Sequence, residues 1–600
     1  MASNHTQQRE SPTLSNTSRT QVWPEWESSR NSDSNADSPW SRKIILSLDG
    51  GGVRGYASLY LLKKIMEQVR HIEMATLSFD MHRAQEPGFQ DGEAPRACSA
   101  AYSWNLDERG KNAIPEEWRM SFLPHHYIDY FVGTSTGGEV SRSILKPIST
   151  DAMKNYNDVG STVFQKGRTY TRFGVIRPRF SSKLMDAALQ RATQQDVVQR
   201  IQPRETNNEI EDTDVKARAD KVLMRTESSD VARTVVVAHG GFKVKKEFLF
   251  RSYDHAPPET RSGRNDRASR HSNPGPASNA PLWVAGRATS AAPGYFSEIK
   301  YGGDVYEDGA MAKWNNPVEL ALKEVEQMHW RHQPKLIISI GTGQKSDRGH
   351  TTGLFHRVIP HEISNLSAAV KTLKKNQLNS HVQHQEFESR LEQRNGDLEI
   401  RYIRFDAPLG LDHELGNIKL GEWRGSDGSE TKHRMENIID QYLELDHEAA
   451  ESLRECAKTL VDTRTKRART ERWERKALHL IYCCSEKILG TDRPCRAPPF
   501  KSRGELRRHA VSDHGFAWKV PCKWPNNTHA AQWTCFSDHC GELKVSGFDS
   551  QEEFEGHLRE VHQHARPKVM TIDAVESWLS ACRSLKEPAR AKTTTGLNGR

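Results

Sequence analysis

The sequence predicts an α/β protein in which a central sheet carries its loops at the carboxyl ends of the strands. The apolar run 43–48 is typical of a buried strand, and it is followed by a glycine loop and by apolar residues at helical spacing over 59–69. A second strand-like run, 127–132, also leads into a glycine-rich turn. Two strand–loop–helix units of this kind indicate an α/β sheet.

Three later segments are further strand candidates, and the rest of the chain divides by composition. The strand candidates are residues 234–238, 248–250 and 336–340. With 600 residues, the chain is too long for one compact domain. We expect a disordered tail over 1–40, the α/β domain over 41–345, a helical extension over 346–480, a small cysteine–histidine module over 481–565 and a polar tail over 566–600. Surface insertions are expected over 75–124, 205–230 and 255–280, with a lid as the alternative for the first of them.

Composition excludes several classes of protein. Hydrophobic residues make up 35% of the chain, and the mean hydropathy is -0.77. No run approaches the ~20 apolar residues of a membrane span, and the first positions lack the apolar core of a signal peptide. We therefore expect an intracellular protein without a transmembrane segment. The net charge of +8 is small for this length, and nine cysteines are too few for a disulfide scaffold, which favours thiol or metal chemistry.

The first chemical motif is a glycine loop between a strand and a helix. It reads Asp49-Gly50-Gly51-Gly52-Val53-Arg54-Gly55. Glycines let the backbone turn tightly and present N–H groups beside a helix N-terminus, where negative charge is stabilised. The spacing of Gly50, Gly52 and Gly55 also fits a dinucleotide fingerprint, which requires a second strand ending in an acid ~20 residues on. Glu73 follows the helix almost directly and leaves little room for that strand, so we favour an anion cradle.

Two further motifs supply candidate catalytic side chains. The first is a G-x-S-x-G turn directly after the strand-like run, with Ser135 between Gly133 and Gly137. Such a turn from strand to helix forces the serine into a strained, exposed geometry, which makes Ser135 the candidate nucleophile. The second is Asp308 followed by Gly309, a tight turn that can direct a carboxylate into a cleft. Each motif alone is also compatible with an ordinary turn.

Together and in this order, the three motifs resemble those of the patatin-like phospholipases. The resemblance covers about 43–343 and includes the connecting segments 248–254, 288–296 and 338–343. It implies a three-layer α/β/α sandwich related to the α/β-hydrolases, and a Ser–Asp dyad that acts on ester bonds of lipids. Residue by residue, it makes Ser135 the nucleophile and Asp308 its base. The implied oxyanion hole is the loop that contains Gly50, Gly51, Gly52, Arg54 and Gly55.

The chemistry of these side chains supports the mapping. A carboxylate can take the serine proton if a dry pocket raises its pKa, so Asp308 is expected to be buried. The N–H groups of Gly51, Gly52 and Thr136 are candidate donors to the oxyanion. Arg54 either adds positive charge near the oxyanion or a phosphate headgroup, or it braces the loop as an ion-pair partner. We expect catalysis to need no cofactor.

One departure from the family pattern concerns the helix after Ser135. The family usually continues with apolar residues there, because that helix is buried beneath the sheet, whereas this chain has Glu139, Ser141 and Arg142. Burying either charge unpaired would be costly. We therefore expect either an exposed face on this helix or an ion pair between Glu139 and Arg142, one turn apart.

Cysteines and histidines beyond residue 482 repeat a spacing that resembles a pair of divergent C2H2 zinc fingers. The expected ligands are Cys484 (or Cys483), Cys495, His509 and His514 in the first, and Cys535, Cys540, His557 and His562 in the second. Histidines five residues apart at a helix end can join two thiolates in a tetrahedral site, around a core too small to fold without metal. Structural zinc is the expected ion, with the second quartet closer to the finger pattern. The alternative is reduced cysteines with surface histidines.

The charges of this region disfavour nucleic acid as a partner. Arginines 503, 507 and 508 on the first expected finger helix could meet phosphates, but glutamates 552, 553, 555 and 560 on the second would be repelled. A protein-interaction or structural module is therefore favoured. The basic run 464–476 fits a solvated helix face, with contact to anionic lipid or a nuclear signal as alternatives.

The leading hypothesis is a lipid acyl hydrolase that forms an acyl-Ser135 intermediate, in lipid catabolism or remodelling. Its expected substrate is a phospholipid or another lipid ester, met by transient contact of a cytoplasmic enzyme with a membrane or lipid surface. Two alternatives stay open. One is a pseudo-hydrolase scaffold whose zinc module binds a protein partner, and the other is a regulator that binds nucleic acid or protein through its fingers.

Overall fold

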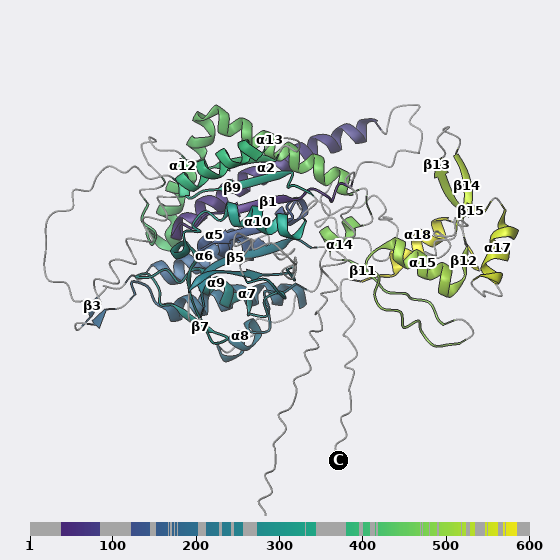
Figure 1. The fold of residues 1–600 in the computed structure, drawn as a ribbon, viewed down its shortest axis with the longest axis horizontal. Coiled ribbons are helices and arrows are strands. Elements are labelled where there is room, and N and C mark those ends of the chain that lie inside the picture. The colour runs from purple at the N-terminus through teal and green to yellow at the C-terminus, as the bar shows by residue number, and fades with distance from the viewer. Residues whose placement is uncertain are drawn as a thin grey trace, which may run out of the picture.

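The computed structural model describes two connected parts, a sheet wrapped by helices and a smaller C-terminal module (Figure 1). The described residues are 38–83, 122–144, 152–165, 167, 171–172, 175–176, 178–201, 212–226, 231–241, 245–255, 273–329, 332–343, 380–394, 400–407, 415, 418–468, 470, 472–478, 480–488, 491–517, 519–523, 529–534, 547–548, 550–561, 568–570 and 572–584. None of the helices in these ranges combines the length and the apolar composition that a membrane span requires.

The central sheet has eight described strands, in the order β10-β9-β1-β2-β5-β8-β7, with β6 also paired to β5. Their bounds are β1 Ile44–Leu48, β2 Tyr130–Thr134, β5 Arg233–Gly240, β6 Lys246–Arg251, β7 Ile299–Tyr301, β8 Asp304–Asp308, β9 Leu336–Ile340 and β10 Arg401–Phe405. The strands from β10 to β5 run parallel, and β6, β7 and β8 pair antiparallel. The expected strands over 43–48, 234–238, 248–250 and 336–340 are confirmed. The run 127–132 becomes strand only from Tyr130, because the short helix α4 (Pro124–Tyr127) precedes it.

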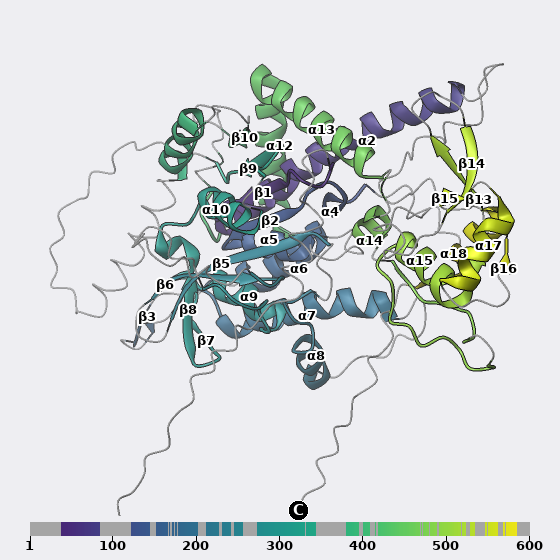
Figure 2. The same ribbon diagram turned by 45° about the vertical axis from the view of Figure 1, so that its right-hand side comes forward.

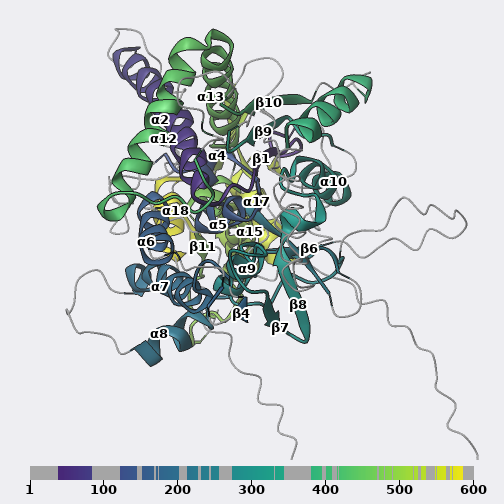
Figure 3. The same ribbon diagram turned by 90° about the vertical axis from the view of Figure 1, so that its left-hand side faces the viewer.

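Helices cover both faces of the sheet and complete a three-layer arrangement (Figure 3). On one face, Leu46 and Phe131 pack in a core shared with α2 and α13, and Val236 packs against α9. On the other face, Ile45 and Val235 pack against α10 and the helical residues 380–394. The helices of this part are α2 Gly55–Arg83, α5 Thr136–Ile144, α6 Ala152–Phe164, α7 Ser182–Ile201, α8 Asp212–Ala219, α9 Leu282–Thr289, α10 Val318–Met328, α12 Ser429–Leu445 and α13 His447–Ala468. Burial on both faces explains why β1 is almost entirely apolar.

The expected helical extension also completes this sheet. Its strand β10 pairs with β9 at the sheet edge, and α12 and α13 lie beside α2 (Figure 2). On α13, Arg464 forms a buried ion pair with Glu73 of α2, and Arg467 forms another with Asp129, the residue before β2. The expectation of a solvated basic face is therefore wrong for these two arginines, because carboxylates from the sheet layer and α2 meet them.

The C-terminal module is built around one shared core. Leu506 on α15, Leu558 on α17 and Leu579 on α18 belong to a single apolar cluster, so the two expected finger helices are not independent units. The helix α14 Arg472–Leu478 precedes the module and packs with Trp473 and Ala477 in the core of the larger part. The elements of the module are β11 Ile481–Tyr482, α15 Arg503–His514, β12 Phe516–Ala517, β13 Lys519–Lys523, β14 His529–Thr534, β15 Gly547–Phe548, α17 Gln551–Glu560, β16 Lys568–Val569, α18 Ile572–Ala581 and β17 Arg583–Ser584. Pairing of β11 with β17 ties the start of the module to its end. The polar tail expected from residue 566 thus contains a helix that belongs to this core.

Candidate active site

Ser135 and Asp308 meet because two strands lie end to end along the same edge of β5. The other edge is occupied by β6, which pairs with β5 over 235–240. Along the shared edge, β2 ends where Thr134 pairs with Val237. The pairing of β8 begins one residue further along β5, where Ala238 faces Asp308. The residue that follows β2 and the last residue of β8 are therefore brought side by side.

Ser135 occupies a strained turn between β2 and α5. Its φ is 54°, in the left-handed region that residues other than glycine rarely adopt. Its backbone N–H donates to Oγ1 of Thr289 at 2.7 Å, and that hydroxyl donates to the Val237 carbonyl at 2.5 Å. A Cβ on Gly133 would lie 2.1 Å from the carbonyl oxygen of Gly137, so the turn has no room for a side chain there. This is the geometry expected of a nucleophile elbow.

Asp308 is buried, and its carboxylate is hydrogen-bonded to the hydroxyl of Ser135. It also accepts a hydrogen bond from the N–H of Ala310 at 2.9 Å. Burial raises the pKa of Asp308 to about 7, although both hydrogen bonds act to lower it. A carboxylate with a pKa near neutrality can both accept and return a proton, as a general base must.

The glycine loop packs against the turn at Ser135, and several of its backbone N–H groups already donate hydrogen bonds within the protein. A Cβ on Gly50 would be 3.0 Å from the Cβ of Ser135. The N–H of Gly50 donates to the Asn315 carbonyl, and that of Gly55 donates within the 3-10 turn Gly52–Arg54, so neither is available to an oxyanion. The N–H of Gly51 donates to the Thr136 hydroxyl at 3.2 Å. Within the described part of the chain, the N–H groups of Gly52 and Thr136 have no hydrogen-bond partner.

Side chains from distant segments hold this loop in place. Arg404 on β10 forms a buried ion pair with Asp49 at 2.7 Å, and the Thr342 hydroxyl donates to the Gly50 carbonyl at 3.0 Å. The Arg54 side chain is buried, and its Nε donates to the Gly51 carbonyl at 3.4 Å. This contact braces the loop through a backbone carbonyl, whereas the bracing role expected for Arg54 was that of an ion-pair partner.

The helix after Ser135 has no exposed side at Glu139, which corrects one of the two expectations for this residue. Glu139 is buried on α5 and packs against α9 at Gly286, where an added Cβ would lie 2.2 Å from its Oε1. Its negative charge acts on Arg287, which also pairs with Asp186 at 2.8 Å. The missing side chain of Gly286 thus makes room for the carboxylate beside a buried cation. The side chain of Arg142 lies outside the described residues, and so does the expected pair with it.

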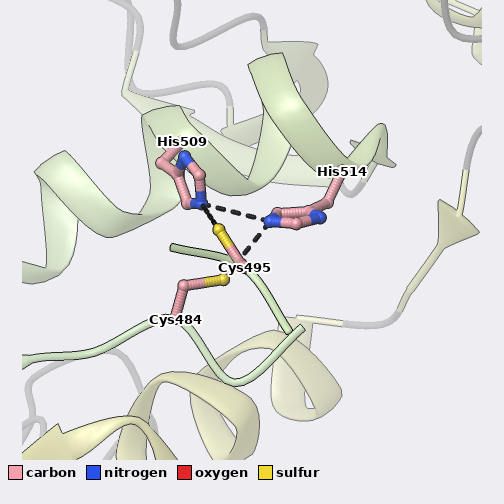
Figure 4. Close-up of side chains that lie close together, drawn as sticks. All are labelled: Cys484, Cys495, His509 and His514. Atoms are coloured by element: carbon pink, nitrogen blue, oxygen red, sulfur yellow. Dashed lines mark hydrogen bonds between the residues drawn. The ribbon is translucent and has the colours of Figure 1, made fainter. Parts of the chain in front are cut away.

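The predicted zinc ligands divide between described and undescribed positions. Cys484, Cys495, His509 and His514 come together in the C-terminal module (Figure 4). His557 is buried on α17. The other members of the second quartet, at positions 535, 540 and 562, lie outside the described residues.

Comparison with known proteins places the elbow and the acid in one family region. Residues 123–322 match the family model of the patatin-like phospholipases. This region is similar to the patatin-like phospholipases. Calcium-independent phospholipase A2-gamma of Rattus norvegicus is 27% identical over 317 residues, covering 51% of this chain and 29% of its own. The Homo sapiens protein of the same name is 26% identical over 303 residues, covering 50% and 28%.

These relatives are much longer than the matched region, since the chain spans less than a third of their length. The crystal structure of VipD from Legionella pneumophila aligns with a TM-score of 0.24 and 10% identity, covering 66% of this chain and 67% of that one. That score is too low to relate the two folds.

Three residues that position the patatin-like site received no role from the sequence. Thr289 lies in a segment with family-like sequence, and Asn315 follows the Asp308 turn, so the sequence offered a signal for both. Asn315 donates from Nδ2 to the Gly50 carbonyl at 3.2 Å. Arg404 lies outside the matched region, and nothing local in the sequence relates it to Asp49.

Replacing Thr289 by valine is expected to lower the rate of any ester hydrolysis at Ser135 by on the order of 10-fold to 100-fold. Valine has nearly the same shape but cannot accept from the Ser135 N–H, and a buried unpaired donor costs about 1–3 kcal/mol. Steady-state hydrolysis of a short-chain ester measures the effect. Thr289→Ser keeps the hydroxyl and should stay close to wild type. Equal loss in both variants would show that packing of the methyl group, and not the hydrogen bond, matters.

Proposed function

We propose that this chain is a lipid acyl hydrolase that cleaves carboxylic ester bonds through an acyl-Ser135 intermediate. The observation that carries the proposal is the buried Asp308 carboxylate hydrogen-bonded to Ser135, at a strained turn within a patatin-like domain. The relatives are named as phospholipases A2, which favours a phospholipid as the substrate. An ester of this kind resides in a lipid surface, so the proposal includes peripheral contact with such a surface.

In the proposed acylation step, Asp308 accepts the proton of the Ser135 hydroxyl while Oγ attacks the ester carbonyl carbon. Negative charge develops on the carbonyl oxygen. The N–H groups of Gly52 and Thr136 are the proposed donors to it, since they carry no other described hydrogen bond. The C–O bond to the lipid alcohol then breaks, and Asp308 returns the proton to the departing alkoxide.

In the proposed deacylation step, a water molecule gives a proton to Asp308 as its oxygen bonds to the acyl carbon. The bond from Ser135 Oγ to the acyl carbon breaks, and the serine recovers the proton from Asp308. A fatty acid leaves, and both side chains return to their starting state. The cycle uses only groups of the chain, the ester and water, so we propose that it needs no cofactor.

Covalent labelling tests the proposal. A fluorophosphonate probe reacts with an activated serine, and we expect it to label the wild-type chain and not the Ser135→Ala variant. Ser426→Ala, which changes an exposed serine, is the matched control and should be labelled like wild type. Full labelling of Ser135→Ala would overturn the assignment of the nucleophile. A folded wild-type chain that takes no label and hydrolyses no ester would favour the pseudo-hydrolase scaffold.

A further inference from the structure

Four side chains of the C-terminal module converge on one point. Cys484 follows β11, Cys495 lies in the loop before α15, and His509 and His514 lie on the last turns of α15 (Figure 4). One ligand atom from each lies within 4.8 Å of all the others. Cys484 Sγ is 3.3 Å from His514 Nε2, Cys495 Sγ is 3.3 Å from His509 Nε2, and the two Nε2 atoms are 3.1 Å apart. These spacings can be compared directly with those of a metal site.

Three of the six ligand–ligand spacings are close to the edges of a tetrahedral zinc site. Zinc lies about 2.3 Å from sulfur and about 2.0 Å from nitrogen, so a regular tetrahedron has S···N edges of roughly 3.5 Å and N···N edges of roughly 3.3 Å. The observed edges are 3.3 Å and 3.1 Å. The donor set of two thiols and two imidazoles is one that structural zinc sites use. The arrangement therefore fits zinc in both geometry and chemistry.

A hydrogen bond outside the quartet orients one ligand toward the centre. His509 Nδ1 lies 2.8 Å from Oδ2 of Asp513, which also accepts from the Ser512 hydroxyl at 2.7 Å. A carboxylate can only accept, so Nδ1 carries the hydrogen and Nε2 of His509 is left with its lone pair. That lone pair faces Cys495 and His514. A carboxylate behind a histidine is the usual outer support of a metal-binding imidazole.

The helix that carries both histidines also docks the module on the patatin-like part. At the first turn of α15, Arg503 forms an ion pair with Glu474 of α14 at 3.4 Å, and both side chains are buried. Two residues further along α14, Lys476 contacts Asp129 at 3.3 Å, just before β2. A continuous line of contacts thus runs from the histidines, along α15 and α14, to the sheet.

We propose that Cys484, Cys495, His509 and His514 bind one Zn²⁺ that closes the C-terminal module and fixes α15 for docking through Arg503 and Glu474. The apolar core of the module is small and draws on segments from residue 482 to residue 582, so a metal cross-link between the loop and α15 supplies order that the core alone lacks. The site lies outside the catalytic machinery, and its role is structural. The proposed site differs from that of an independently folding zinc finger, because β17 and α18 belong to the same folded unit.

Metal analysis of the full-length chain tests this proposal. We expect the double variant Cys484→Ser with Cys495→Ser to hold about one zinc fewer per chain than wild type, which isolates this site from any other zinc in the chain. Cys483→Ser is the matched control, because it changes the adjacent cysteine outside the quartet and should keep the full zinc content. Equal zinc content in wild type and the double variant would overturn the proposal.

A second measurement keeps the proposal testable if the double variant folds poorly. Wild-type chain reloaded with Co²⁺ should show the absorption bands of tetrahedral, thiolate-ligated cobalt, and Cys483→Ser should show the same bands. After zinc is removed, backbone amides of α15 and α14 should exchange hydrogen faster. Arg503→Met should speed exchange in α14, because the ion pair with Glu474 is lost, but it should retain zinc. Absence of the cobalt bands would contradict the metal site. Unchanged hydrogen exchange after zinc removal would contradict its role in docking. Labelling of Ser135 is read separately, so failure here is distinct from failure of the proposed hydrolase.

Discussion

Asparagine in place of Asp308 is expected to lower kcat for a short-chain ester by about 1,000-fold, because a positioned general base contributes typically 10²-fold to 10⁴-fold. The amide has the same size and can still accept from the Ala310 N–H, but it cannot take the proton of Ser135. Steady-state kinetics on p-nitrophenyl esters measure kcat and KM. We expect KM to change little, since the carboxylate acts on the nucleophile and not on the bound lipid.

The control for this variant is Glu307→Gln, one residue earlier on β8. That carboxylate is half-buried and pairs with Lys245 and His239 rather than with Ser135. Its removal should leave kcat within a few-fold of wild type. Comparable losses in Glu307→Gln and Asp308→Asn would mean that a change of charge anywhere on β8 disturbs the site, and would refute a specific base.

The pH profile provides an independent readout of Asp308. Its pKa is raised to about 7, so the wild-type kcat/KM should rise with pH through about 7 as the carboxylate ionises. The raised pKa means that the folded chain holds this proton more tightly than the unfolded chain. The resulting stabilisation is full below the unfolded pKa near 4 and is lost as the pH rises through about 7. Asp308→Asn should therefore fold as well as wild type at neutral pH.

Asparagine in place of Asp129 is expected to lower the free energy of unfolding by about 3–5 kcal/mol, the typical cost of removing one partner from a buried ion pair. The Asp129 carboxylate meets Arg467 at 2.8 Å and Lys476 at 3.3 Å, and it accepts from the Ile44 N–H at 2.8 Å. Burial acts to raise the pKa of Asp129, but the surrounding cations hold it well below its usual range. Urea or thermal unfolding of the full chain measures the change.

The matched control is Asp440→Asn, which breaks the pair with Lys64 at the surface. That pair has a 2.8 Å contact, but Asp440 is 46% exposed, so its loss should cost less than about 1 kcal/mol. Labelling of Ser135 at low temperature should survive in both variants. At the rise per residue of a strand, the chain from Asp129 to Ser135 spans about 20 Å, so the ion pair lies away from the nucleophile. Similar stability of the two variants would show that the buried cations tolerate the loss of their carboxylate.

The sequence was most informative where a function depends on a short segment. The Gly50 loop and the turn around Ser135 are local patterns, and the structure gives them the close contacts and positive φ that such patterns require. Asp308 was identified only through resemblance to a family, because its approach to Ser135 depends on β2 and β8 sharing an edge of β5. No local pattern encodes that arrangement.

Partners that are distant along the chain account for what the sequence could not predict. Glu139 and Gly286 are far apart in sequence, so the space that receives the carboxylate could not be foreseen from the helix alone. Cys484 and Cys495 have a wide spacing in the sequence, yet their side chains converge with those of His509 and His514. Backbone hydrogen bonds between Tyr482 and Phe500 and from Cys495 to Glu486 bring the two cysteine segments together near the start of α15, and no short pattern in the sequence encodes them.

The position of β10 at the sheet edge limits how far the chain can be shortened without disturbing the candidate site. The family match ends at residue 322. However, Arg404 holds the Asp49 loop through a buried ion pair, and α12 and α13 cover the helix that follows that loop. A fragment trimmed to the matched residues would keep Ser135 and Asp308 but lose the segment that contains Gly51 and Gly52, and would expose the bare edge of β2. Replacing Arg404 should therefore impair the proposed hydrolysis by loosening the Asp49 loop, although no proposed reacting group lies on β10.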